Sequence, residues 1–364
     1  MKTLEKIINS IKNIARPFAF AGALALSSLA GCINDGDEII PDPPPAYTWE
    51  ETQKNPLMHE GVVLTSWWYD DYLRPQSDFT LEYLHGLGAE SVSILATQYQ
   101  DSSSPAAIYY DLWKTPMDSG IEHVIQKSKS LGMRTVLKPH VDPTDGTWRG
   151  NITFSSEAEW ASWFNSYKNF ILHYAQLAED NGVDMLVIGT ELAGTTHREA
   201  DWSQLIDDIK AVFSGEITYA ADNDNYQNIT WWNRLDYIGV NAYFPLTASS
   251  DPTLSELISE WSLIAQELQA FSQAQGKKII ITEIGYQSYD GANMMPWWAP
   301  TSIPDEQEQA DCYEAFLSNL FNQGFIAGIY PWMCYHNPWQ DVDGFDFAAK
   351  PAEDNLGNYY HLMD

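Results

Sequence analysis

The stretch SEAEWASWFNSYKNFILHYAQLAEDNGVDMLVIGTE, residues 156–191, joins a long helical pattern to a short apolar run. In its first part, large apolar side chains recur at the three-to-four spacing of one helix face, which predicts a helix over 156–180 packed against a core. The following run DMLVIGTE, residues 184–191, predicts a strand. The helical face consists of Trp160, Trp163, Phe164, Tyr167, Phe170, Ile171, Tyr174 and Leu177.

Short β-branched runs and longer helical patterns alternate along the rest of the chain, which favours βα units around a parallel sheet. Eight strands with helices between them favour a closed barrel over an open sheet. The sequence therefore predicts the α/β class and a (β/α)8 TIM barrel in a single domain. The expected strands are 61–67, 91–97, 134–140, 184–191, 216–221, 237–244, 278–284 and 326–333. The other expected helices are 118–131, 254–274 and 306–322, whereas 223–234 is a short and weak helical segment.

Residues 1–31 have the layout of a bacterial lipoprotein signal peptide. Basic residues come first, an apolar run over 18–26 follows, and the stretch LSSLAGC ends at Cys32. The apolar run is shorter than the roughly 20 residues that a membrane-spanning helix needs. We therefore expect membrane attachment only through lipid on Cys32, with an ordinary signal peptide and an unmodified cysteine as the alternative. The basic residues are Lys2, Lys6, Lys12 and Arg16.

The expected location is the bacterial cell envelope, with the folded domain in the periplasm or outside the cell. Ile33 follows the cysteine in place of the aspartate that retains lipoproteins at an inner membrane, which favours the outer membrane. The acidic, proline-rich stretch over 33–46 is unsuited to burying a core. We therefore expect residues 32–54 to be the lipidated cysteine and its tether. Residues 55–364 then form the barrel domain, a length that loop insertions accommodate.

The chain is strongly acidic, with a formal net charge of −31. An acidic surface repels phosphate backbones, so nucleic acid is a poor partner and a neutral polysaccharide is a better one. The acidity is equally compatible with a role in solubility alone. The chain also has 15 Trp and 20 Tyr residues, more than a core alone requires. Because aromatic faces stack on sugar rings, some of them are expected to line a cleft.

No metal and no cofactor are expected. Cys312 and Cys334 match no zinc pattern, and both a disulfide and two buried thiols are compatible with their spacing. The sequence has no glycine-rich phosphate loop and no cluster of His and Asp at strand ends. His140 has no second histidine at ligand spacing. A metal- or phosphate-dependent reaction is therefore disfavoured. The chain is expected to be a monomer.

Two of the expected strands end in a glutamate. Glu191 closes VIGTE in the fourth strand and Glu283 closes IITE in the seventh. Active sites lie at this end of barrel strands, and a carboxylate there is costly unless it is paired, solvated or used in chemistry. A structural ion pair with Lys or Arg is the alternative interpretation. Two carboxylates across the barrel mouth suit glycoside hydrolysis, with retention at a separation of about 5–5.5 Å and inversion at about 6.5–9.5 Å.

Five motifs follow one another along the chain. They are TVLKPHVD followed by TWRG (135–150), VIGTELAGT (187–195), LDYIGVNAYFPL (235–246), ITEIGY (281–286) and IYPWMCYHNPW (329–339). Together they resemble glycoside hydrolase family 113, from roughly residue 57 to residue 364. The resemblance implies a retaining β-mannanase that cleaves β-1,4-mannosidic bonds in mannan, glucomannan or manno-oligosaccharides. It also implies Glu191 as the acid/base and Glu283 as the nucleophile.

Several alternatives stay open at this point. An enzyme of the same fold that acts on another β-glycan, such as a glucan, xylan or galactan, has the same pair of glutamates. A carbohydrate-binding lipoprotein that lost the chemistry is a further rival. Thr190 stands where the most familiar signature of the wider clan has Asn, which loosens any inference about the sugar 2-hydroxyl. Endo and exo action are not distinguished, although the aromatic insertion at 289–304 is a candidate wall of the cleft.

Other residues near strand ends are candidates for contact with a β-linked oligo- or polysaccharide. Tyr243 is expected to donate its hydroxyl to Glu283. Lys138 and His140 point to the same side of one strand and suit sugar hydroxyls. The aromatic candidates are Trp332 under the attacked sugar, Trp339 under the next ring, Trp148, and one of Trp67 and Trp68, each with core packing as its alternative. The remaining polar candidates are Asn223, Asn241 and Arg149.

Overall fold

The computed structural model describes residues 58–103, 107–337 and 344–361. The expected signal peptide, the tether and Cys32 lie outside the described residues, and so does Trp339. Among the helices that are described, none is long and apolar enough to cross a bilayer.

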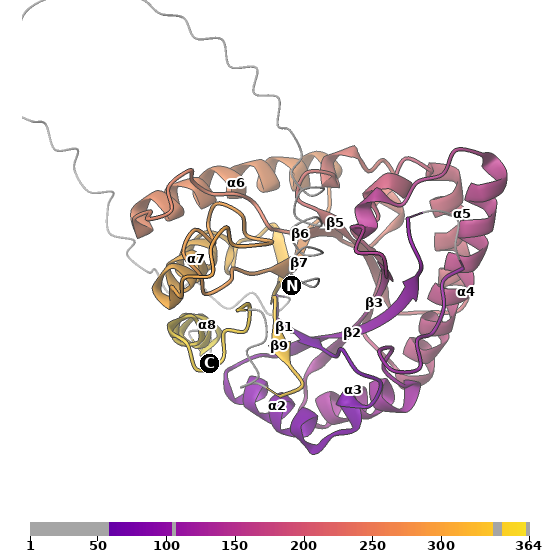
Figure 1. Ribbon diagram of the computed structural model, residues 1–364, viewed down its shortest axis with the longest axis horizontal. Helices are drawn as coiled ribbons and strands as arrows, with labels where there is room; N and C mark the ends of the chain where they lie inside the picture. Colours follow the sequence, from indigo (N-terminus) through magenta and orange to yellow (C-terminus); the bar gives the residue numbers. More distant parts are fainter. Residues whose placement is uncertain (1–57, 104–106, 338–343, 362–364) are drawn as a thin grey trace, which may run out of the picture. The chain divides into compact units, whose positions relative to one another are not determined.

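Eight parallel strands close into a barrel, and helices surround it (Figure 1). Each strand pairs with its neighbour in the chain, and β8 pairs back onto β1. The predicted (β/α)8 barrel is therefore confirmed. The strands are β1 (His59–Thr65), β2 (Ser91–Gln100), β3 (Arg134–Pro143), β4 (Met185–Thr190), β5 (Glu216–Asp222), β6 (Ile238–Asn241), β7 (Ile279–Ile284) and β8 (Ile326–Pro331), followed by the short β9 (Cys334–Tyr335) beside β1.

The four clearest helices expected from sequence are present as α3, α4, α6 and α7. Three further helices, α2, α5 and α8, were not predicted. The weak segment 223–234 contains two 3-10 turns, η4 (Tyr226–Asn228) and η5 (Trp232–Arg234), in place of an α-helix. The helices are α2 (Pro75–Gly86), α3 (Asp118–Ser130), α4 (Glu157–Asn181), α5 (Glu199–Lys210), α6 (Leu254–Gln275), α7 (Glu306–Leu320) and α8 (Pro351–His361).

Helix α4 supports the strand that leads to the first glutamate. It starts in a capping box between Ser156 and Glu159 and ends at Gly182, whose φ of 59° lies in the left-handed region that glycine tolerates. The whole predicted apolar face is buried. Tyr167 within that face donates its hydroxyl to the Ile188 carbonyl of β4 at 2.9 Å. The helix therefore holds β4 through a specific hydrogen bond as well as through packing.

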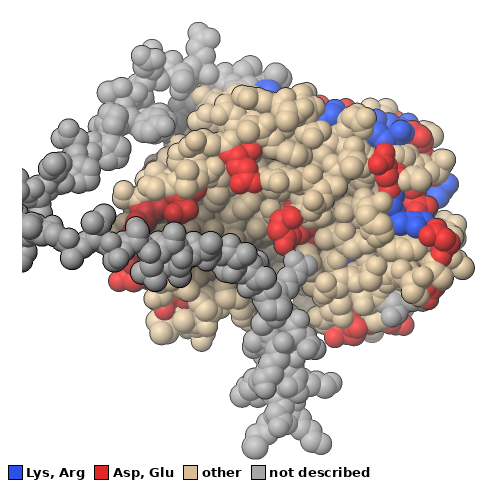
Figure 2. Space-filling model, turned by 90° about the horizontal axis from the view of Figure 1, so that it is seen from above, with Lys and Arg blue, Asp and Glu red and all other residues tan. Residues whose placement is uncertain are grey.

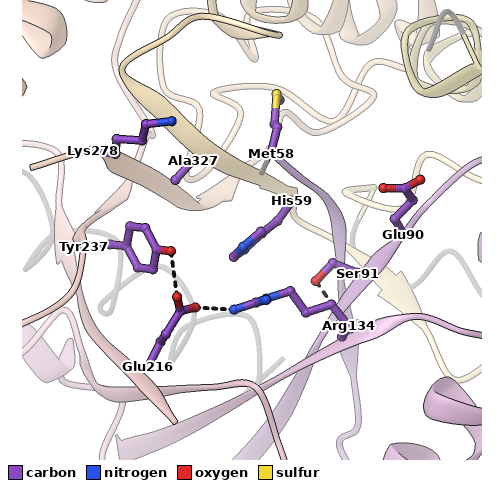
Figure 3. A pocket seen from close by; sticks show the side chains of 9 residues that line it. All are labelled: Met58, His59, Glu90, Ser91, Arg134, Glu216, Tyr237, Lys278 and Ala327. Atoms are coloured by element: carbon purple, nitrogen blue, oxygen red, sulfur yellow. Dashed lines mark hydrogen bonds and ion pairs between the residues drawn. The ribbon is translucent and has the colours of Figure 1, made fainter. Parts of the chain in front are cut away.

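The amino-terminal end of the barrel contains a small polar cavity of about 270 Å³ (Figure 3). Arg134 and Glu216, which line it, form an ion pair, and the Tyr237 hydroxyl donates to the same carboxylate at 2.9 Å. His59 Nδ1 lies 3.1 Å from the Tyr330 hydroxyl, and burial lowers the pKa of His59 to about 4. Several of the polar side chains around this cavity thus already pair with one another.

The two cysteines in the described part of the chain are buried free thiols. Cys312 lies in α7 and Cys334 in β9, and burial raises the pKa of both thiols well above the usual value. Of the two alternatives that the sequence left open, the structure therefore shows the thiols and not the disulfide. Neither thiol is suited to nucleophilic chemistry, because the reactive thiolate is disfavoured.

Gly239 in β6 provides a test of how tightly the barrel is packed. A Cβ at this position would lie 2.2 Å from the Tyr219 carbonyl oxygen of β5, whereas a Cβ at Gly86 in α2 would meet nothing within 4 Å. We expect Gly239→Ala to lower the free energy of unfolding by about 1–3 kcal/mol or more. Gly86→Ala should leave it unchanged or raise it by about 0.5–1 kcal/mol. Urea unfolding followed by tryptophan fluorescence measures both, and equal midpoints for the two variants would contradict the close approach.

Candidate active site

Both glutamates lie at the carboxyl-terminal end of the barrel. Glu191 directly follows β4, and its backbone N–H donates to the Ala220 carbonyl of β5 at 2.8 Å. Glu283 lies in β7 and is paired in register with Asn241 of β6. The Glu283 side chain is buried, whereas Glu191 is half-buried. The two carboxylates therefore share one end of the barrel but differ in their access to water.

The backbone at Glu191 takes an uncommon conformation. Its φ is 51°, in the left-handed region, which costs a non-glycine residue roughly 1–2 kcal/mol. Side chains hold the turn that follows: the Leu192 N–H donates to the Tyr219 hydroxyl at 2.8 Å, and the Thr195 hydroxyl donates to the Leu192 carbonyl at 2.8 Å. The surrounding structure thus fixes a conformation that turns the chain sharply at the end of β4.

Asn241 connects the two halves of the site. Its side-chain N–H donates to Glu191 Oε1 at 2.9 Å. Its side-chain oxygen accepts from the Thr282 hydroxyl at 2.8 Å and from Lys138 Nζ at 3.4 Å. Asn241 is fully buried, and its contacts with Thr282 and Lys138 are buried, whereas its contact with Glu191 is only partly buried. The residue lies between the carboxylates as a bridge, which is a more central place than its candidacy from sequence suggested.

Lys138 requires a correction. The sequence predicts that its ammonium group binds sugar hydroxyls, but the side chain is completely buried. Its Nζ donates to Glu283 Oε1 at 2.5 Å, to the Thr282 carbonyl at 2.9 Å and to Asn241 at 3.4 Å. An ammonium group has three donors, and all three are directed at protein acceptors. Lys138 therefore acts on the carboxylate of Glu283, a contact that the spacing of residues in the sequence did not reveal.

The Glu283 carboxylate is held from both sides. Lys138 binds one oxygen, and the Tyr243 hydroxyl donates to Oε2 at 3.0 Å, which is the contact expected from sequence. Burial raises the pKa of Glu283, and the adjacent Lys138 ammonium opposes this shift. Burial also raises the pKa of Tyr243, so its hydroxyl stays protonated and remains a donor. The arrangement orients the carboxylate and favours its ionised form against the cost of burial.

Trp148 contacts the other glutamate. Its indole N–H donates to Glu191 Oε2 at 3.2 Å, so both oxygens of this carboxylate have a donor. The ring lies against Gly150, where a Cβ would come within 2.3 Å of the ring carbons. Gly150 belongs to the turn η2 (Arg149–Asn151), which packs beside η3 (Ala193–Thr195) after Glu191. Only glycine at this position leaves room for the indole, which explains the TWRG pattern in physical terms.

His140 is buried on β3 next to the same carboxylate as Lys138. Its Nε2 atom lies 3.8 Å from Glu283 Oε1, which is too long for a hydrogen bond, and its Nδ1 lies 2.8 Å from Arg149. Burial lowers the pKa of His140 well below its usual value, and the cations Arg149 and Lys138 add to this effect. The imidazole ring is parallel to the half-buried Trp332 indole, with centroids 6.4 Å apart.

A cleft of about 490 Å³ opens at the end of β3, where Asp142 and Pro143 line it. Trp67 and Trp68 both line it, and the expectation that at most one of them contacts substrate stays a prediction. Trp67 is half-buried and packs edge-on against Trp332, while Trp68 is 53% exposed. The main-chain N–H groups of both tryptophans donate to Asp71 at 3.0 Å, which fixes their turn. Trp148 and Arg149 lie on the wall of the same cleft.

Asn223 is the predicted site residue with the least support. It lies half-buried in the turn after β5, and none of the described contacts joins it to either glutamate. Its neighbour Asp222, which was not among the residues predicted from sequence, ends β5 and is buried. Burial and a hydrogen bond to Asp224 raise the pKa of Asp222 to about 9. The sequence does contain a signal for Asp222, because the strand EITYAAD ends in an acidic residue, as VIGTE does at Glu191.

Within the described residues, one group of carboxylates is compact enough to hold a metal ion. It comprises Asp290, Asp305 and Glu308, whose ligand atoms lie within 4.8 Å of one another. Both Glu308 oxygens already accept hydrogen bonds, from the backbone of Gly291 and from the backbone and side chain of Asn293. These contacts hold the loop between β7 and α7. The absence of a metal requirement stays a prediction.

Several solved structures are similar to this chain. The GH113 β-mannanase AaManA from Alicyclobacillus acidocaldarius, solved with ManMIm, has a TM-score of 0.76 and 24% identity, over 84% of this chain and 98% of that one. A further structure of a GH113 β-1,4-mannanase has a TM-score of 0.74 and 25% identity, over 83% and 98%. The endo-β-1,4-mannanase from Thermotoga petrophila has a TM-score of 0.55 and 12% identity, over 84% and 76%.

Sequence comparison gives the family directly. Among curated protein sequences, none matches this chain significantly. The model of Glycoside Hydrolase Family 113, however, matches residues 68–344, which is most of the chain and includes both glutamates. The resemblance noted from five sequence motifs is thereby confirmed. This chain belongs to glycoside hydrolase family 113 and is a glycoside hydrolase.

Proposed function

We propose that the enzyme hydrolyses β-1,4-mannosidic bonds with retention of configuration, with Glu283 as nucleophile and Glu191 as acid/base. The observation that carries this proposal is the different surroundings of two carboxylates at one end of the barrel. Glu283 is buried between a cation and a phenol. Glu191 is half-buried and receives two neutral N–H donors. A two-step displacement requires such a difference between its two carboxyl groups.

The roles follow from what each environment allows. A nucleophile must be ionised and aimed, and the contacts of Lys138 and Tyr243 with Glu283 support both. An acid/base must exchange protons with water between the two steps, which the more accessible Glu191 can do. Glu283 attacks the anomeric carbon while Glu191 protonates the leaving oxygen. Glu191 then takes a proton from water, which attacks the same carbon and releases Glu283.

The proposed substrate is a neutral β-mannan, glucomannan or manno-oligosaccharide. The family supports this choice, as do the similar structures described as β-1,4-mannanases. The tryptophans along the cleft suit stacking on sugar rings. In the view of Figure 2, acidic side chains are spread over the visible face, while Lys and Arg gather towards one side. Such a surface disfavours anionic polymers. Hydrolysis of a glucan, xylan or galactan by the same site is the alternative.

The cellular location is part of the proposal. We infer from the sequence that Cys32 carries lipid and anchors the enzyme in the bacterial cell envelope, with the outer membrane favoured by Ile33. The catalytic domain would then act in the periplasm or outside the cell. A lipid-anchored barrel on an acidic, proline-rich tether would reach a polymer too large to enter the cytoplasm.

Replacing each glutamate separates the two roles. On manno-oligosaccharides, we expect Glu191→Gln and Glu283→Gln each to lower kcat/KM by a factor on the order of 10² to 10⁴ or more. On a manno-oligosaccharide with a nitrophenolate leaving group, which needs no proton, bond cleavage by Glu191→Gln should be spared and that by Glu283→Gln should not. Glu179→Gln, at an exposed surface contact, is the control. Equal losses on both substrates would contradict the assignment of roles.

Product analysis tests substrate and stereochemistry together. We expect the purified chain to cleave manno-oligosaccharides, galactomannan or glucomannan, with NMR showing the β-anomer before mutarotation. Cellulose, xylan and galactan should be cleaved much more slowly. Release of the α-anomer first would refute the double displacement, and preference for another β-glycan would replace the proposed substrate while leaving the mechanism in place.

Replacing Lys138 tests the electrostatic part of the mechanism. Lys138 lowers the pKa of Glu283 against the effect of burial, so Lys138→Met should raise that pKa. Because the reaction needs ionised Glu283, the acid limb of the pH profile of kcat/KM should move to higher pH. Lys127→Met, which removes an exposed ion pair with Glu82, is the control and should leave the profile unchanged. An unmoved acid limb in a folded Lys138→Met enzyme would show that this cation does not control the nucleophile.

Lipid labelling tests the anchor. When cells that produce the full-length chain grow with a radiolabelled fatty acid, the wild type should incorporate label and sediment with membranes. Cys32→Ser should do neither, because it lacks the thiol to which the lipid is attached. Cys312→Ser, which removes a buried thiol in α7, should keep the label. Label retained in Cys32→Ser would refute lipidation at this residue.

A further inference from the structure

One short segment contacts the surroundings of both glutamates. Trp148 donates to Glu191, and Arg149, the next residue, reaches the strand that carries His140. The Arg149 guanidinium group pairs with Asp142 Oδ1 at 2.5 Å, and its NH1 atom lies 2.8 Å from His140 Nδ1. Asp142, His140 and Lys138 alternate along β3, so their side chains point to the same side.

The chemistry of arginine decides the state of His140. A guanidinium group has only N–H donors and stays charged at any working pH. His140 Nδ1 must therefore accept the hydrogen bond through its lone pair, and it carries no proton. Burial and the neighbouring cations keep the ring neutral, because they lower the pKa of His140 well below its usual value. The single ring proton then lies on Nε2.

That proton has no acceptor in the described structure. His140 Nε2 is buried, makes no hydrogen bond to the described residues and lies 3.8 Å from Glu283 Oε1. The charged and titratable groups around the ring are Lys138 and Asp142 on β3, Arg149 on η2, Glu283 on β7 and Glu191 after β4. The Trp332 ring lies parallel to the imidazole. A fixed N–H donor thus stands unused beside the carboxylate that would attack the sugar.

We propose that Arg149, held by Asp142, is a positioning residue that fixes His140 as a neutral Nε2–H donor for a ring hydroxyl of the attacked sugar. This inference rests on the proposed function of Glu283 as nucleophile. The opposite tautomer would place a lone pair towards Glu283 and offer no donor to the sugar. Arg149 therefore determines which ring nitrogen of His140 carries the proton. It acts through its hydrogen bond to His140 Nδ1, and that hydrogen bond involves no atom of the substrate.

Imidazole nitrogen shifts report this state directly. The full-length chain is labelled with ¹⁵N-histidine, and the His140→Gln variant assigns the signals among the eight histidines. In the wild type, we expect His140 to show a protonated Nε2 and a bare Nδ1 without titration from about pH 5 to about pH 8. In Arg149→Met, the signals should show mixed tautomers or titration within this range, and kcat/KM should fall at least about tenfold, mainly through kcat.

Two further variants separate positioning from folding. Arg134→Met removes an arginine that also pairs with a glutamate, but at the other end of the barrel. It should leave the His140 signals unchanged and kcat/KM within about twofold of wild type. Arg149→Lys keeps the cation without the two-pronged donor, and should lie between wild type and Arg149→Met in both readouts. If Arg149→Met does not fold, as judged by its melting temperature, the Arg149→Lys result replaces it.

The outcomes distinguish this inference from the function on which it rests. A wild-type His140 with its proton on Nδ1, or an unchanged His140 in folded Arg149→Met, would overturn the inference. Loss of activity in Arg149→Met with the tautomer unchanged would also overturn it, because Arg149 would then act by another route. If the wild type cleaves no mannan but its tautomer depends on Arg149, the positioning is upheld and the proposed substrate fails.

Discussion

The buried contact between Lys138 and Glu283 is the interaction on which the site depends. Removing both charges from water is energetically unfavourable. Hydrogen bonds offset this desolvation, because the ammonium group has three acceptors and the carboxylate has a second donor in Tyr243. Removing one partner of such a pair typically costs about 3–5 kcal/mol. The contact also crosses the barrel from β3 to β7, so it joins strands that lie far apart in the sequence.

The rest of the barrel makes this contact possible. Below it, the barrel interior is filled with apolar side chains that exclude water, and the amino-terminal end is closed by charges that pair with one another. The two carboxylates lie at the carboxyl-terminal end. Asn241 links them there through Glu191 on one side and Lys138 on the other, and the turn after β4 holds Glu191. Burial raises the pKa of Glu283, and Lys138 opposes this shift. Glu191 is only half-buried, so its carboxyl group stays accessible to water.

The sequence predicted the elements whose patterns are strong and local. The eight strands are short β-branched runs, and the apolar face of α4 repeats at helical spacing. Helix α2 was missed because its buried face includes the small polar residues Ser77 and Thr80, which interrupt any apolar stripe. The contact of Tyr243 with Glu283 followed from neighbouring strand ends, but that of Lys138 did not. A partner across the barrel depends on closure of the sheet, and spacing along the chain carries no signal for it.

The packing of Trp148 over Gly150 has a consequence for anyone who wishes to adapt this enzyme. Because consecutive residues, Trp148 and Arg149, reach the acid/base and the neighbourhood of the nucleophile, a change in this loop alters the environment of both carboxyl groups at once. The two limbs of a pH profile would then shift together rather than separately. Engineering that aims at only one limb has more freedom at Tyr243, whose side chain contacts Glu283 and not Glu191.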